Sequence, residues 1–139
     1  MNNCQPALNR RQLAALLGVL GLSPEVLHAQ DAAKVAPHLY RVVLENDKVR
    51  VLEYTSEPGT GVCGVGKHWH PAHVTVQLTP VKLRLTPDGG NSIEMDVPAG
   101  VVFWEPAVMH TTENIGRGSA RAYVIEIKDA NWKAATGTT

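Results

Sequence analysis

Short runs of β-branched and other apolar residues, separated by turn residues, occupy the sequence from residue 40 to residue 127. No segment of this stretch shows a sustained helical period. The expected strands are 40–44, 49–55, 66–70, 74–79, 81–86, 92–97, 101–104 and 120–127. Eight short strands predict an all-β fold that closes into a sandwich or barrel.

The breaks between these runs have the composition of turns. Pro58-Gly59 follows the second run, Pro87-Asp88-Gly89-Gly90 precedes the sixth, and Pro98-Ala99-Gly100 precedes the seventh. Proline and glycine at such places favour the backbone angles of tight turns. In Val81-Lys82-Leu83-Arg84-Leu85 apolar and basic residues alternate, which predicts a strand with one face buried and the other in water.

The size and charge of the chain limit its architecture and its partners. With 139 residues, 44% apolar and 19% charged, it has material for one domain. Thirteen basic and 13 acidic residues leave no excess charge to neutralise a phosphate backbone, so we expect no nucleic-acid partner. The two cysteines, Cys4 and Cys63, match neither a zinc ribbon nor a disulfide framework.

The first 29 residues resemble an export signal. Arg10 and Arg11 precede an uncharged run at 13–22, and Ala29 supplies a small residue at the expected cleavage point. The paired arginines also resemble a twin-arginine signal, although the general export route remains an alternative. Because a membrane-spanning helix needs about 20 apolar residues, we expect no stable membrane span. A periplasmic or secreted protein is predicted; the alternative is an amphipathic amino-terminal helix packed on the barrel.

These observations divide the chain into four parts. We expect an export signal at 1–29, a linker at 30–39, the β-barrel at 40–128 and a carboxyl-terminal tail at 129–139. The tail ends in small polar residues that bury little surface.

Two histidines in one predicted strand indicate a metal site. His68 and His70 are two positions apart, so in a strand they point to the same face, roughly 6.6 Å apart at the backbone. Imidazole nitrogens bind divalent metals at about 2.0 to 2.1 Å, within reach of both side chains. His110, forty residues after His70, is the candidate third ligand.

The sequences around these histidines resemble the two motifs of the cupin superfamily. Lys67-His68-Trp69-His70-Pro71 is similar to the first motif, and Gly100, Pro106, His110 and Asn114 follow the order of the second, with Val108 where the family has a glycine. The resemblance covers about two thirds of the chain. It implies a small single-domain bacterial cupin with a jelly-roll β-barrel, one divalent metal ion, a small-molecule substrate and a homodimer.

The sequence departs from the family where a glutamate ligand is expected. Val74 or Thr75 stands there, and His73 is one position early. His73 is therefore a candidate fourth metal ligand, or else it points to solvent from a bulge. Gln77 shares strand parity with His73, so it lines the cavity or makes a cross-strand hydrogen bond.

The ligand set has chemical consequences. Neutral imidazoles leave the full charge of a divalent ion in the cavity, so anionic or oxygen-rich molecules should bind there. Three histidines with open positions resemble the iron cupins that react substrates with dioxygen, whereas zinc or nickel would favour Lewis-acid chemistry. Iron, zinc, manganese and nickel are not distinguished. We predict a dioxygenase-like oxidoreductase; the alternatives are a carboxylate- or sugar-binding cupin, an isomerase or lyase, and a barrel stabilised by its metal.

Two carboxylates are candidate acids or bases near the ion. Glu53 shares parity with Val49 and Val51, so it faces the cavity as a catalytic residue or lies on an exposed strand face. Glu105 stands before Pro106 near the expected cavity mouth, or in a solvated turn. An enzyme needs a positioned acid or base, whereas a binding protein does not, so Glu53 is the discriminating residue.

Overall fold

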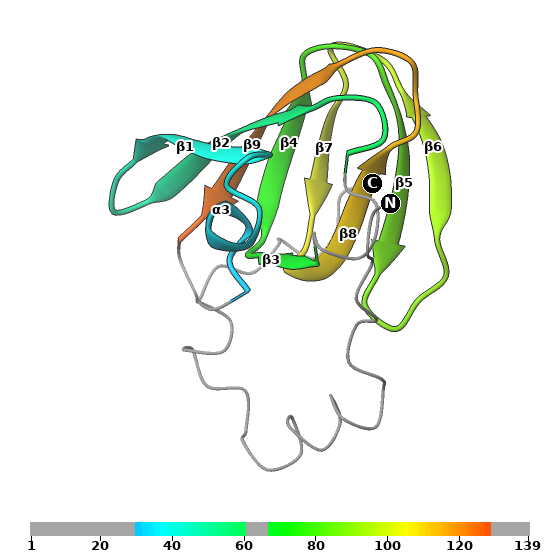
Figure 1. The fold of residues 1–139 in the computed structure, drawn as a ribbon. Helices are drawn as coiled ribbons and strands as arrows, with labels where there is room; N and C mark the ends of the chain where they lie inside the picture. Colours follow the sequence, from blue (N-terminus) through cyan, green and yellow to red (C-terminus); the bar gives the residue numbers. More distant parts are fainter. Residues whose placement is uncertain (1–29, 61–66, 129–139) are drawn as a thin grey trace, which may run out of the picture.

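The computed structural model describes residues 30–60 and 67–128 (Figure 1). The predicted export signal, the tail at 129–139 and Cys63 lie outside these residues. The described part contains one short helix, α3 (Ala32–Val35), and nine strands. These are β1 (Tyr40–Glu45), β2 (Val49–Ser56), β3 (His68–His70), β4 (His73–Gln77), β5 (Val81–Pro87), β6 (Ile93–Val97), β7 (Val102–Glu105), β8 (Val108–Asn114) and β9 (Ala120–Ile127).

The strands form two antiparallel sheets, which confirms the all-β prediction. One sheet has the strand order β1-β2-β9-β4-β7 and the other has the order β3-β8-β5-β6. Figure 1 shows the two sheets arranged around a common interior. No strand pair in the described ranges joins one sheet to the other by hydrogen bonds. The fold is therefore a two-sheet jelly roll whose edge strands stay open, and the expected closed barrel is wrong in this respect.

The predicted strands all overlap strands of the structure, but β8 was missed. Its residues alternate between buried and partly exposed positions, as a strand requires. The buried positions carry His110, Thr112 and Asn114, which are polar. Because the inward face of β8 is polar, the apolar alternation that identifies other strands is absent there.

The core lies between the sheets and extends into residues 30–39. Leu52 on β2 is fully buried, and Val124 on the neighbouring β9 is 6% exposed. Ala32 and Ala36, in and just after α3, are also fully buried in the core cluster. Within residues 30–39, the segment expected as a linker, small side chains let α3 pack against β1 and β3.

Asn114, the last residue of β8, is fully buried and fixes the turn that leads into β9. Its Nδ2 donates hydrogen bonds to the carbonyl oxygens of Gly118 (2.9 Å) and Ser56 (3.3 Å). Its Oδ1 accepts a hydrogen bond from the backbone nitrogen of Gly116 (3.0 Å). The asparagine that resembles the family motif therefore has a structural role.

Replacing Asn114 by alanine should destabilise the fold without removing the metal site. Three backbone groups lose their partner, so we expect the free energy of unfolding to fall by about 2 kcal/mol or more. Urea unfolding measures this loss. Asn46→Ala is the control, because Asn46 caps an exposed turn through Lys48 and Val49 and should cost less. Equal losses in the two variants would contradict the role of Asn114.

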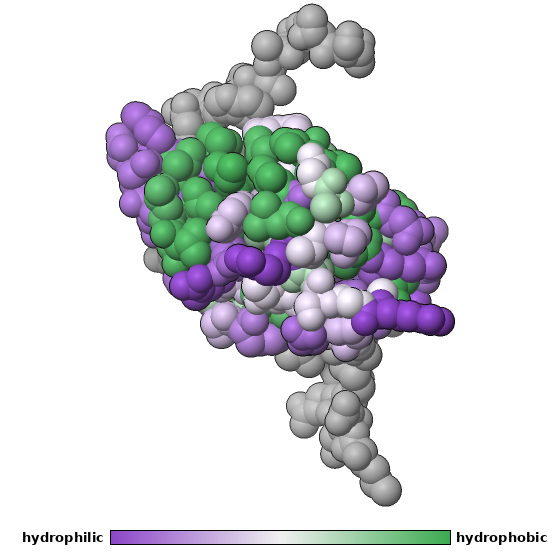
Figure 2. All heavy atoms as spheres, turned by 90° about the horizontal axis from the view of Figure 1, so that it is seen from above, coloured by the Kyte–Doolittle hydropathy of each residue, from purple (hydrophilic) through white to green (hydrophobic). Residues whose placement is uncertain are grey.

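Exposed apolar side chains mark both edges of the larger sheet. On β1 they are Val42, Val43 and Leu44, and on β7 they are Val102 and Trp104. Figure 2 shows a face of the molecule on which hydrophobic side chains gather, with hydrophilic side chains along its borders. None of the helices in the described residues is both long and apolar enough for a membrane span.

Candidate metal centre

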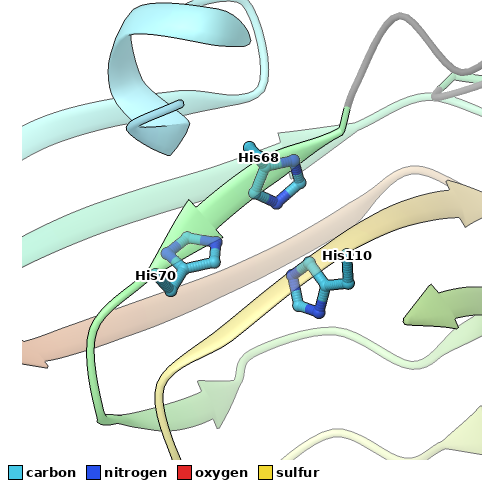
Figure 3. Close-up of side chains that lie close together, drawn as sticks. All are labelled: His68, His70 and His110. Atoms are coloured by element: carbon cyan, nitrogen blue, oxygen red, sulfur yellow. The ribbon is translucent and has the colours of Figure 1, made fainter. Parts of the chain in front are cut away.

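The structure brings His68, His70 and His110 together. His68 and His70 lie on β3, and His110 on the adjacent β8 pairs directly with His68. One ligand nitrogen from each residue lies within 4.8 Å of the others. Figure 3 shows the three rings turned toward one another from the two strands. This spacing suits three imidazoles around one ion.

The three rings are buried and fit a metal ion chemically. Burial, together with the neighbouring His68 and His70, lowers the pKa of His110 to about 3. Burial also lowers the pKa of His70 well below its usual value. Neutral imidazoles offer the lone pairs that metals bind. Within the described residues both ring nitrogens of His110 are buried without a hydrogen-bond partner, an arrangement that a bound ion would relieve.

His70 has a partner behind it that the sequence analysis missed. Its Nδ1 lies 2.7 Å from Oε1 of Glu126, which is 1% exposed. Burial raises the pKa of Glu126 to about 7, although Arg50 acts in the opposite direction. With Nδ1 engaged, Nε2 of His70 is the nitrogen left for a metal. Arg50 binds Glu126 and, in turn, Asp31.

His73 is buried but lies outside the three-histidine cluster. Its Nδ1 lies 2.7 Å from the carbonyl oxygen of Pro71 and must donate, because a carbonyl only accepts. Its Nε2 lies 2.9 Å from Oε2 of Glu105. Both nitrogens are therefore engaged, although the ring centroid is only 5.0 Å from that of His70. His73 thus neither joins the cluster nor points to solvent, because Glu105 holds it in the interior.

His73 and Glu105 shift each other's protonation. Burial by itself lowers the pKa of His73, but the hydrogen bonds with Glu105 and Pro71 raise it above its usual value. Burial by itself raises the pKa of Glu105, but the hydrogen bond from His73 lowers it. The side chain of Glu105 is 24% exposed and lines the cavity, so it is not a solvated turn residue.

Glu53 faces away from the cavity, so of its two predicted orientations the structure shows the one on the outer strand face. Its carboxylate binds Arg41 and Arg121, which hold its pKa below the usual value. The inward positions of β2 are those of Leu52 and Tyr54. Val49 and Val51 share the outer face with Glu53 and are partly covered there, so their apolar character did not distinguish the two faces of the strand.

A cavity of about 410 Å³ opens beside the histidine cluster. Its lining includes His70 and His110 together with Glu105. Gln77 also lines it and donates to the carbonyl oxygen of Arg121 on β9 (3.2 Å), so this residue has both of its predicted roles. The wall is mainly apolar, with contributions from Leu83, Leu85, Met95, Val97, Val101, Phe103, Ala122 and Val124.

Solved structures with the same architecture identify the fold. A cupin domain from Bordetella pertussis Tohama I is 29% identical over 64% of this chain and 91% of that chain, with a TM-score of 0.53. The chain has the cupin fold. A second cupin structure is an RmlC-like protein with a double-stranded β-helix fold from Methanocaldococcus jannaschii. It is 13% identical over 63% of this chain and 77% of that chain, with a TM-score of 0.52.

Comparisons of the sequence itself gave no such match. No family model and no curated protein matches this chain. The resemblance inferred from the two motifs therefore agrees with the structural comparison, which shows the cupin fold. The three histidines of the motifs are those that the fold gathers into one cluster.

Proposed function

We propose that this cupin is a metal-dependent dioxygenase for a small molecule that chelates the ion through oxygen. One observation carries the proposal: three buried histidines form one cluster, and two of them, His70 and His110, line a mainly apolar cavity that also contains the carboxylate of Glu105. The histidines would hold one divalent ion and leave coordination positions for substrate and dioxygen.

The cavity lining supports a particular class of substrate. Among the described residues the lining includes Asp96 and Glu105 but no lysine or arginine. A negatively charged oxygen of the substrate would therefore pair with the ion rather than with a side chain. The apolar wall suits a hydrocarbon or aromatic body and offers a sugar few hydrogen bonds. An enol, phenol, diketone or carboxylate on an apolar body fits best.

The side chains have distinct tasks in this proposal. A bound ion would supply Lewis acidity and, as iron, a route for electrons from the substrate to dioxygen. The apolar wall excludes water from the reacting atoms. Glu105 Oε2 and His73 Nε2 share a proton at the cavity wall and are placed to exchange it with the substrate. Both oxygen atoms enter the product and the electrons come from the substrate, so no further reductant is required.

Oxygen uptake tests the proposal. We expect the protein loaded anaerobically with iron(II) to consume one dioxygen per substrate from a panel of small acids, diketones, phenols and thiols. Labelled dioxygen should place both atoms in the product. The zinc-loaded protein is the control and should bind the same compound without oxygen uptake. Binding without turnover by the iron protein would instead indicate a binding cupin, and conversion without oxygen would indicate an isomerase or lyase.

Two expectations from the sequence stay predictions. Export through the segment at 1–29 is checked by amino-terminal sequencing of the mature protein. The homodimer is checked by the mass in solution.

A further inference from the structure

A buried chain of ionic contacts runs from Asp31, the residue before α3, to His70 in the candidate metal centre. Oε1 of Glu126 lies 2.7 Å from Nδ1 of His70, and Oε2 of Glu126 accepts a hydrogen bond from Nε of Arg50 at 2.6 Å. Nη2 of Arg50 donates to Oδ2 of Asp31, also at 2.6 Å. The side chains of Asp31, Arg50 and Glu126 are 4%, 16% and 1% exposed. We propose that these three residues position His70 for metal binding and couple residues 30 and 31 to the site.

The first step of the argument is the orientation of the ring. An ionised Glu126 can only accept a hydrogen bond, so it holds the proton of His70 on Nδ1. Nε2 then carries the free lone pair toward the cluster. A carboxylate in this place fixes both the tautomer and the ring angle, and it strengthens the imidazole as a ligand. Arg50 occupies the other oxygen of Glu126, which stops the carboxylate from rotating away.

The second step is the anchoring of β3. This strand has only three residues, and in its sheet it is an edge strand that pairs with β8 alone. On its other side the backbone nitrogen of Trp69, between the two histidines, donates to the carbonyl oxygen of Gln30 at 2.7 Å. Asp31 also forms a bridge with Trp69. Residues 30 and 31 therefore hold β3 through the backbone, while Asp31 holds His70 through Arg50 and Glu126.

The third step is charge. When Glu126 is ionised, two carboxylates and one guanidinium leave one net negative charge buried behind the histidine cluster. A buried charge without a counterion is costly. A divalent cation among the histidines would compensate it, so the chain of ionic contacts favours occupation by a cation. Gln30 and Asp31 would thus support the metal centre without being ligands.

Replacing Glu126 by glutamine tests the proposal, which depends on the metal site proposed above. The amide retains the shape but loses the charge and presents an NH2 group to Arg50 or His70. We expect the dissociation constant for Zn²⁺, measured by competition with a chelator, to rise about 10- to 100-fold. The visible absorption spectrum of bound Co²⁺ should also change, because a less constrained His70 alters the ligand geometry.

Glu53→Gln is the matched control. Glu53 also lies on the larger sheet and binds arginines, including Arg121 on β9, but it is on the outer face. Its replacement should leave the Zn²⁺ affinity and the Co²⁺ spectrum unchanged. A change as large as that in Glu126→Gln would overturn the proposal, because a general loss of stability would then explain both variants.

Asp31→Asn is the second variant, and it still tests the proposal if Glu126→Gln does not fold. Asparagine still accepts the hydrogen bond that Ala33 donates to Oδ1 at the start of α3, so only the ion pair with Arg50 is lost. We expect a weaker Zn²⁺ affinity, with a smaller change than in Glu126→Gln. Unchanged affinity and spectrum in the folded variants would refute the positioning role. Absence of Zn²⁺ and Co²⁺ binding by the unaltered protein would refute the proposed metal function itself.

Discussion

Replacing His68 and His70 together by alanine is expected to abolish metal binding. The unaltered protein should carry about one divalent ion per chain, since its three imidazoles form a single cluster. The double variant keeps only His110, and one buried imidazole does not hold an ion against dialysis. Elemental analysis after dialysis measures the result directly. Metal-dependent oxygen uptake should be lost with the ion.

Two further variants make the result specific. His38→Ala removes an exposed histidine outside the cluster and should leave the metal content unchanged. His110→Asn tests the ligand on β8 with a smaller change in volume, and it should also lose the ion. Circular dichroism shows whether each variant remains folded. A full metal content in the folded double variant would exclude the proposed site.

The histidine cluster was largely predictable because it depends on local geometry. Alternation along a strand places His68 and His70 on one face, whatever the rest of the fold. The prediction that His110 joins them depended on the resemblance to a known motif, since no local rule brings together residues forty positions apart. Most strands were also predictable, because they are short β-branched or apolar runs bounded by turn residues. The strand β8 was not, because His110, Thr112 and Asn114 make its inward face polar.

The residues around the cluster depend on strand pairing, which one sequence does not determine. Arg50 shares parity with Leu52 and Tyr54, so the sequence offered a signal, which was not used, of an inward charge in need of a partner. That partner, Glu126, is 76 residues away on β9 and becomes a neighbour only through the pairing of β2 with β9. The two orientations predicted for Glu53 could not be distinguished for a related reason, because the outer face of β2 also carries valines. In the proposed function the acid-base role considered for Glu53 therefore falls to Glu105.

Replacing Glu105 by glutamine should reduce turnover strongly while the metal stays bound. Glu105 lies outside the three-histidine cluster, so the ion should remain at its normal content. The amide cannot take or give the proton that Glu105 shares with His73, and loss of a positioned acid or base costs about 10²- to 10⁴-fold in rate. We expect kcat for oxygen uptake to fall within that range, with a much smaller change in KM.

The split between kcat and KM separates a chemical role from a structural one. If Glu105 only held His73 in place, its loss would disturb the cavity wall and raise KM, while kcat at saturation would change little. Glu53→Gln is the control, since it removes a carboxylate that also binds basic side chains but lies on the outer face. Its kcat and KM should match those of the unaltered protein. Unchanged kcat in Glu105→Gln would contradict proton transfer by this residue. Glu105 would then not be the acid or base that distinguishes an enzyme from a protein that only binds its ligand.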